Sequence, residues 1–134
     1  MGETKGDQIL ILVDTDVLIE ILDEGSKKGE AALKKIVEAR EDITTTSLNL
    51  HEILFDLYKY ANNSKIEKIL LLEVTEFTKG DAALSAKLEV KAEKRGNKIP
   101  RFDTMIAAVA INRGFKLFTF NKKHFEVFED LILF

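Results

Sequence analysis

The chain has 134 residues, of which 46% are hydrophobic and 32% charged, which fits one globular domain. These proportions exclude disordered, fibrous and collagen-like proteins. Cysteine is absent, which excludes disulfide scaffolds, cysteine nucleophiles and thiolate metal sites. The longest apolar runs, 9–13 and 105–111, are too short for a membrane span or a signal peptide. We therefore expect a single domain over 1–134, cytoplasmic and without a membrane partner, whose residues 1–7 form a flexible N-terminus.

The net charge of −3 conceals an asymmetry along the chain. Residues 1–90 carry 11 basic and 18 acidic side chains, whereas residues 91–134 carry 9 basic and 5 acidic ones. The basic stretch is either a solvated face or a surface for an anionic partner beside an acidic site.

In the first half of the chain, apolar patterning predicts two strands and three helices. The run up to Val13 is rich in β-branched residues and predicts a buried parallel strand. Helical spacing of apolar residues follows from about Val17. The expected elements are a strand at 8–13, helices at 17–22 and 28–40, a strand at 42–46 and a helix over 50–61.

The second half continues this alternation. Thr78 and Asp81 have the spacing of an N-terminal cap with its third helical residue, and Gly114 is a helix stop. The expected elements are helical turns at 66–72, a strand at 72–75, helices at 78–95 and 102–113, and strands at 115–120 and 131–134.

Alternating strands and helices predict an α/β fold with a central, mainly parallel sheet of four to five strands and helices on both faces. In such sheets, ligands bind beyond the carboxyl ends of the strands. The residues that directly follow strands or begin helices are therefore the candidates for function.

Asp14 and Asp16 directly follow the first predicted strand. A helix cap would explain one of them. Two carboxylates at a buried strand end exceed what a cap requires, and a buried charge costs free energy unless a partner compensates it. Both the capping and the functional interpretation stay open.

Three further polar residues are expected at the same edge. Glu52 has a structural explanation as the third residue of a capping box that begins at Asn49. Asp103 is a lone acid at the start of a strongly apolar helix, so it is either a cap or a metal ligand. Asn121 ends a strand, as a turn residue or as a ligand. Carboxylates gathered without a basic partner repel one another, but one or two Mg²⁺ or Mn²⁺ ions between them make the cluster stable.

Four sequence blocks together resemble the PIN domain, and in particular the small VapC-type toxin ribonucleases of toxin–antitoxin pairs. They are LVDTDVLIEIL, SLNLHEILFDL, IPRFDTMIAAVAINRG and KLFTFNKKHF. The resemblance implies a three-layer α/β/α sandwich and a metal-dependent endoribonuclease that uses Mg²⁺ or Mn²⁺. It also implies RNA as substrate, a homodimer and inhibition by a cognate antitoxin.

By position, the resemblance assigns Asp14, Glu52 and Asp103 to the three invariant acids of the family, with catalytic and metal-binding roles. Asn121, the fourth candidate catalytic residue, lies where many members have another acid. Asp16 lies where asparagine is commoner, and it adds a negative charge and a further metal ligand.

The resemblance also places supporting residues around this cluster. Thr119 matches a hydroxyl residue beside the site. The nearby basic side chains would contact RNA phosphates, and such contacts weaken as salt rises. The candidates are Lys98, Arg101, Lys122 and Lys123.

Two alternatives compete with the nuclease hypothesis. A PIN domain that does not cleave would serve as an RNA-binding or protein-assembly module. The Asp14-x-Asp16 pattern also resembles the nucleophile motif of haloacid-dehalogenase-like phosphatases, but the chain is short for them and lacks their later lysine and paired acids at suitable positions.

Overall fold

The computed structural model describes residues 9–134. The predicted flexible N-terminus at 1–7 lies outside the described residues. Among the residues described, no helix combines the length and apolar character that a membrane crossing would need.

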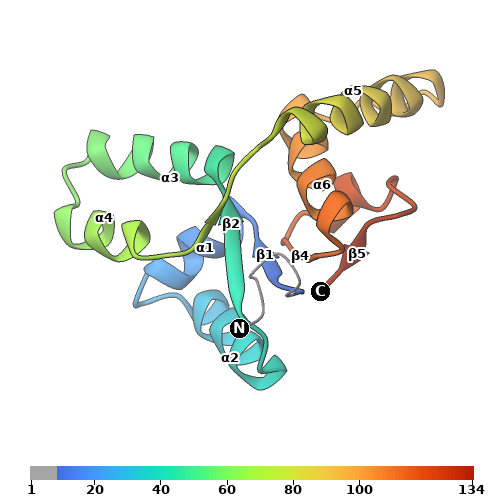
Figure 1. Cartoon of the computed structure of the whole chain (residues 1–134). Helices are drawn as coiled ribbons and strands as arrows, with labels where there is room; N and C mark the ends of the chain where they lie inside the picture. The colour runs from blue at the N-terminus through green and yellow to red at the C-terminus, as the bar shows by residue number, and fades with distance from the viewer. Residues whose placement is uncertain (1–8) are drawn as a thin grey trace, which may run out of the picture.

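The described residues form five strands and seven helices that alternate along the chain, as Figure 1 shows. In chain order they are β1 (Ile11–Val13), α1 (Thr15–Leu22), α2 (Lys27–Ala39), β2 (Ile43–Thr46), α3 (Ser47–Lys59), α4 (Asn63–Leu70), β3 (Val74–Thr75), α5 (Lys79–Lys94), α6 (Arg101–Arg113), β4 (Lys116–Phe118), α7 (Lys122–Phe125) and β5 (Ile132–Leu133).

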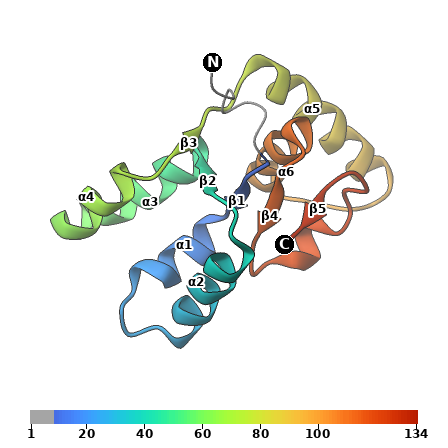
Figure 2. The same ribbon diagram turned by 60° about the horizontal axis from the view of Figure 1, so that its bottom comes forward.

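The five strands form one sheet in the order β3-β2-β1-β4-β5, and every neighbouring pair is parallel. Strand β1 lies at the centre, with Ile11 opposite Ile43 on one side and Lys116 on the other. Figure 2 shows β2 and β4 flanking it. The predicted parallel sheet is confirmed. Its topology brings the ends of β1 and β4, which are far apart in sequence, to the same edge.

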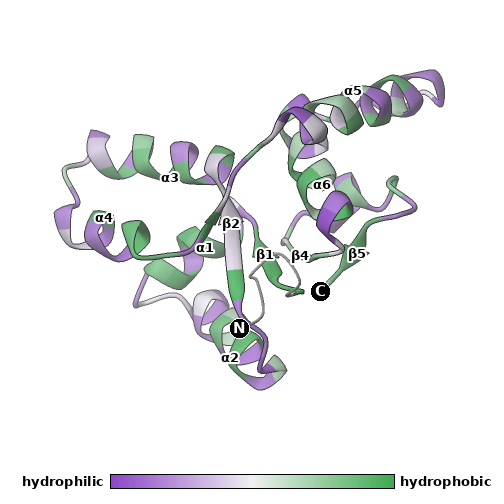
Figure 3. Cartoon of the chain, in the orientation of Figure 1, coloured by the Kyte–Doolittle hydropathy of each residue, from purple (hydrophilic) through white to green (hydrophobic). Residues whose placement is uncertain are grey.

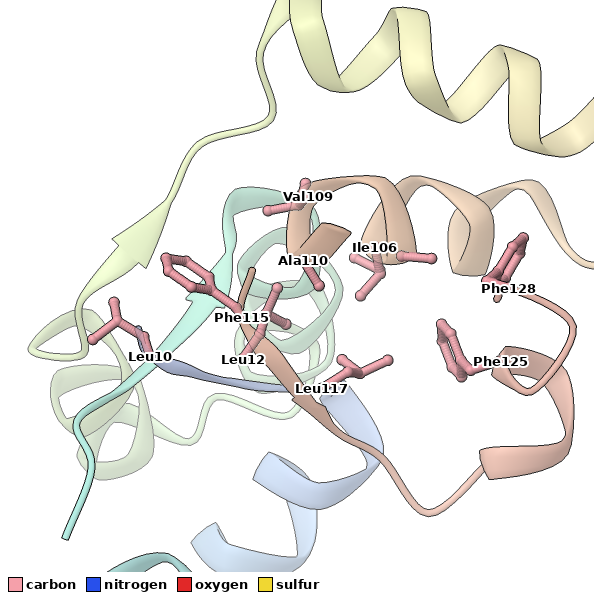
Figure 4. Close-up of a cluster of buried hydrophobic side chains, with 10 residues drawn as sticks. Leu10, Leu12, Ile106, Val109, Ala110, Phe115, Leu117, Phe125 and Phe128 are labelled. Carbon is pink, nitrogen blue, oxygen red and sulfur yellow. The ribbon is translucent and has the colours of Figure 1, made fainter. Parts of the chain in front are cut away.

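Helices cover both faces of this sheet, and β1 consists of hydrophobic residues, as its green colour in Figure 3 shows. Leu10 and Leu12 face the layer that contains α6, whereas Ile11 and Val13 face the layer that contains α1 and α2. Figure 4 shows the first of these two cores. Its buried members are Leu10, Leu12, Ile106, Ala107, Val109, Ala110, Phe115, Leu117, Phe125 and Phe128.

Helices α1 and α2 meet at a close contact that depends on Gly29. A Cβ atom at this position would lie 2.0 Å from the carbonyl oxygen of Glu20. Ser26 caps α2 by accepting from the amide of Gly29 at 3.0 Å, and its hydroxyl donates to Oε1 of Glu20 at 2.7 Å. The contact fixes the direction of α1, whose first turn follows β1.

Helices α5 and α6 are joined by a partly buried cluster that we call the α5–α6 brace, formed by the ion pair of Asp81 and Arg113 together with Asn112. Arg113 donates from Nη1 to Oδ1 of Asp81 at 2.8 Å and from Nη2 to Oδ2 at 3.0 Å, and Asn112 donates at 2.8 Å. Burial alone would raise the pKa of Asp81, but these hydrogen bonds outweigh it and lower the pKa to about 2. The capping box predicted for Thr78 and Asp81 is also present.

The main difference from the predicted elements lies after β4. The short helix α7 was not predicted, because four residues are too few to show a helical pattern. Its buried Phe125 fixes it against the core. As a result, Asn121 precedes a helix instead of a loop.

Candidate functional site

Asp14 lies between β1 and α1, at the carboxyl edge of the sheet, and it caps α1. Its Oδ1 accepts hydrogen bonds from the amide of Thr15 at 2.9 Å and from Nδ2 of Asn49 at 3.0 Å. Its Oδ2 accepts from the hydroxyl of Thr119 at 2.8 Å. The side chain is buried, and these three partners are all neutral. The capping role is therefore present, but it leaves the negative charge uncompensated.

The electrostatic surroundings of Asp14 favour its protonated form. Burial, together with the nearby carboxylate of Asp16, raises its pKa to about 6, and Asp103 adds a smaller effect in the same direction. The hydrogen bonds from Thr119 and Thr15 oppose this rise without cancelling it. A cation beside Asp14 would favour its ionised form and lower its pKa.

Asp16 lies in the first turn of α1 and faces the end of β4. Its Oδ2 accepts from the amide of Phe120 at 3.2 Å, whereas Oδ1 is buried and has no hydrogen-bond partner among the described residues. Burial raises the pKa of Asp16, and Asp103 adds a small effect in the same direction. The backbone amides of Phe120 and Val17 counteract part of this rise in the pKa, and the charge of Lys28 adds to their effect. Lys28 itself lies over the Phe120 ring, with Nζ 4.6 Å from the ring centroid.

Asp103 and Asn121 are joined through a histidine. Nδ1 of His124 lies 2.8 Å from Oδ2 of Asp103 and 2.7 Å from the side-chain nitrogen of Asn121. The backbone amide of Asn121 donates to the hydroxyl of Thr119 at 3.1 Å, and this hydroxyl donates to Asp14, so hydrogen bonds connect Asp14 with Asn121. No side chain caps α6, whose N-cap is Pro100, so the capping interpretation of Asp103 is wrong.

The capping box predicted for α3 is shifted by three residues. Thr46 is the N-cap and Asn49 is the third helical residue, because β2 runs directly into the helix. Oδ1 of Asn49 accepts from Thr46 while its Nδ2 donates to Asp14. Glu52 lies in the next turn, is exposed, and forms no hydrogen bond or ion pair with another described residue. Its catalytic role stays a prediction.

The four basic residues predicted to contact RNA differ in their surroundings. Lys98, Lys122 and Lys123 are exposed. Arg101 pairs with Glu89 through Nε–Oε1 and Nη2–Oε2 contacts of 2.9 and 3.0 Å. An RNA contact by Arg101 would compete with this pair, whereas the three lysines are accessible.

The acidic cluster fits a hard divalent cation by its chemistry. Three carboxylates gather at one edge, the pKa of Asp14 and that of Asp16 are both raised, and Oδ1 of Asp16 is buried without a partner in the described part of the chain. Mg²⁺ and Mn²⁺ prefer such oxygen ligands. Within the residues described, no three acidic or histidine side chains already converge on one point, and His124 engages Asp103.

Three residues of this site were not predicted as members of it. Asn49 was assigned only to capping, although an amide in the first turn after a strand can also reach the neighbouring strand end. His124 and Lys28 lack a sequence signal, because only the fold brings α7 and α2 to the acids.

Comparison with known proteins places this geometry in context. The PIN domain profile matches residues 11–130. No curated protein matches the sequence. Among solved structures, VapBC2 from Rickettsia felis bound to a promoter DNA fragment has a TM-score of 0.80 at 24% identity, covering 94% of this chain and 98% of the other. FitAcB from Neisseria gonorrhoeae has a TM-score of 0.79 at 25% identity, with coverages of 93% and 96%.

A third similar structure, DNA-bound VapBC from Salmonella typhimurium, has a TM-score of 0.81 at 20% identity and coverages of 94% and 97%. These likenesses extend over the whole described sheet and its helices. With the profile match over most of the chain and the acids at the carboxyl edge of a parallel sheet, they show that this chain belongs to the PIN domain family.

Proposed function

We propose that the protein is a metal-dependent endoribonuclease that hydrolyses RNA phosphodiester bonds and acts as the toxin of a type II toxin–antitoxin pair. The observation that carries the proposal is the buried carboxylate of Asp14, which accepts hydrogen bonds only from neutral donors and lies near Asp16 and Asp103. A buried acid with a purely structural role would have a basic partner, as Asp81 has in Arg113, because unpaired buried charges destabilise the fold.

The residues that would hold one or two Mg²⁺ or Mn²⁺ ions are Asp14 and Asp103, with Asp16 and Glu52 as further ligands. A bound divalent ion would stabilise charge on the scissile phosphate and lower the pKa of an attacking water. Asn49 and Thr119 hold the two oxygens of Asp14 in place through their hydrogen bonds. The backbone amide of Asn121 donates to the Thr119 hydroxyl and holds the residue at the same edge. Its side-chain amide can there bind the substrate or the water molecules around the ion.

The exposed lysines complete the proposed substrate site. Lys122 and Lys123 directly follow Asn121, and Lys98 precedes α6, so their charges would hold RNA phosphates on either side of the scissile bond. We assign Arg101 to the same role after exchange of its Glu89 partner. RNA binding that weakens with added salt would support these contacts.

The toxin assignment is supported by the resemblance to solved VapBC complexes. We extend it to a cognate antitoxin, a homodimer and a cytoplasmic location. The absence of cysteine is compatible with a reducing compartment.

The test is cleavage of a mixed pool of structured RNAs by antitoxin-free protein. Reactions with Mn²⁺, with Mg²⁺ and with a chelator are compared for wild type and Asp103→Asn. We expect metal-dependent cuts that Asp103→Asn reduces at least a hundredfold, since it removes a proposed ligand.

The matched control is Asp130→Asn, an exposed acid remote from the cluster in sequence, which should cleave like wild type. Equal cleavage by Asp103→Asn and wild type would contradict the proposed site. Metal-independent RNA binding without any cleavage would favour the alternative, a PIN domain that serves as a binding or assembly module.

A further inference from the structure

His124 is an unexpected side chain at the acidic edge, and it directly contacts a proposed ion ligand. Its Nδ1 lies 2.8 Å from Oδ2 of Asp103, a distance typical of a charge-assisted hydrogen bond. The two residues come from different elements, α7 and α6, and lie far apart in sequence. The contact is therefore a product of the fold.

The chemistry of the ring fixes the direction of this hydrogen bond. An ionised carboxylate only accepts, so Nδ1 of His124 must carry the proton that it donates to Asp103. The side-chain nitrogen of Asn121 lies 2.7 Å from the same Nδ1, where two donors would face each other, so this tautomer requires the Asn121 side-chain amide to turn its oxygen toward His124. The Nε2 atom remains at the opposite side of the ring.

Packing does not explain the contact. The side chain of His124 is 42% exposed, whereas that of Asp103 is 17% exposed. The anchor of α7 is its neighbour Phe125, which is 1% exposed. His124 thus contributes little to the core, and its Nδ1 contacts a carboxylate that is less exposed than the histidine side chain itself.

The consequence for Asp103 concerns its two oxygens. Oδ2 is engaged by His124, and within the described residues Oδ1 has no hydrogen-bond partner. A carboxylate held by one oxygen presents the other in a defined direction. Outer hydrogen bonds of this kind orient metal ligands and typically change metal affinity 10–100-fold.

We infer that His124 is a positioning residue that orients Asp103 for a divalent cation through its Nδ1–H bond to Oδ2. The inference rests on the proposed function, because it assigns a role toward the same ion. It adds a residue that acts through Asp103 and that touches neither substrate nor ion.

The first test measures Mn²⁺ dissociation constants in the absence of RNA. We expect His124→Ala to bind Mn²⁺ at least about tenfold more weakly than wild type. His124→Asn should largely restore the affinity, because its amide nitrogen lies near the position of Nδ1. His124→Gln should not, because its amide lies near the position of Nε2.

Two controls separate positioning from folding. His51→Ala removes the other histidine, which is exposed on α3, and should leave the Mn²⁺ affinity unchanged. Asp103→Asn should lose more affinity than His124→Ala. Urea unfolding of the His124 variants should have the wild-type midpoint.

The second test is spectroscopic and needs no ion. In His51→Ala, His124 is the single imidazole, so a long-range proton–nitrogen spectrum reports its protonation state directly. We expect a proton on Nδ1. A neutral ring protonated only on Nε2 would overturn the inference, because Nδ1 then has no proton to donate.

The outcomes distinguish the inference from the function on which it rests. If wild type binds Mn²⁺ and His124→Ala binds it equally well or more tightly, the positioning role is wrong and the proposed function stands. If wild type binds no Mn²⁺, both are wrong. Weaker binding by His124→Ala and His124→Gln, with recovery in His124→Asn, supports the inference.

Discussion

Asp14 and Asp81 are both buried aspartates near the start of a helix, yet their environments differ. Asp81 accepts two hydrogen bonds from the Arg113 guanidinium, which with Asn112 lower its pKa to about 2. Asp14 accepts only from neutral donors, and burial raises its pKa to about 6. One carboxylate has its counter-charge within the chain, and the other does not.

This difference separates Asp81, an acid with a complete structural role, from Asp14, a proposed ion ligand. The α5–α6 brace is electrostatically complete, because the charge of Asp81 is paired within the chain and breaking the pair would leave Arg113 without its partner. The acidic cluster around Asp14 is incomplete, and Asp16 adds a second negative charge to it. A protein retains such an arrangement at a cost in stability, which is typical of sites that bind a ligand.

The largest expected effect tests the brace. Asp81→Asn should lower the free energy of unfolding by about 3 kcal/mol, because it leaves the partly buried Arg113 without its ionic partner. Urea unfolding measures this loss. A loss below about 1 kcal/mol would show that the ion pair contributes no more than a surface pair.

The pH dependence sharpens the comparison, since the pKa values of Asp81 and Asp14 are shifted in opposite directions. The lowered pKa of Asp81 gives stability that is present above about 3.8 and is lost as the pH falls through about 2. The raised pKa of Asp14 gives stability that is present below 3.8 and is lost as the pH rises through about 6. For the more deeply buried Asp14, the raised pKa corresponds to a loss of roughly 3 kcal/mol above pH 6.

The corresponding measurement is urea unfolding of metal-free wild type, Asp14→Asn and Asp81→Asn between pH 2 and pH 7. The stability difference between Asp14→Asn and wild type should grow from pH 4 to pH 7. The difference between wild type and Asp81→Asn should shrink as the pH falls from 4 to 2. If the free energy of unfolding changed with pH in the same way in all three proteins, the comparison would be contradicted.

Asp14→Asn itself should stabilise the metal-free protein at pH 7 by about 1–2 kcal/mol, which is less than the full electrostatic gain because one acceptor is lost. Saturating Mn²⁺ should make wild type more stable than Asp14→Asn. An ion that binds only native wild type adds about 2.7 kcal/mol to its free energy of unfolding at a hundredfold excess over the dissociation constant. Strong destabilisation of metal-free Asp14→Asn would mean that the capping role of Asp14 dominates.

The smallest effect is expected for an exposed ion pair. Lys34 and Glu38 lie 3.9 Å apart on α2, with side chains 78% and 66% exposed. Glu38→Ala should change the free energy of unfolding by less than about 0.5 kcal/mol, and added salt should remove the change. A larger effect would show that charge pairs matter here irrespective of burial.

Much of the fold followed from local patterns. The central strand, the stop at Gly114 and the cap at Thr78 depend on neighbouring residues alone, and all three are present. The start of α3 was misplaced because Asn49 and Thr46 are both good caps, and only the end of β2 decides between them. Helix α7 depends on the burial of Phe125, which no local pattern reveals.

The candidate site was predictable only in part. Asp14, Asp16 and Asp103 stood out because charges at the ends of apolar elements are unusual, and the structure brings them together. His124 and Lys28 could not be predicted, since their neighbours come from strands and helices distant in sequence. The exposed Glu52 shows the reverse case, a residue whose predicted role needs an ion and substrate to test it.

The order of the strands has a consequence for synthesis on the ribosome. Strand β1 is made early, but α6, which carries Asp103, and the partner strand β4 are made only after α5. Until they emerge, one edge of β1 is unpaired and its apolar face is uncovered. The acidic cluster likewise forms only after Asp103 has been made, so a shorter nascent chain lacks the proposed site.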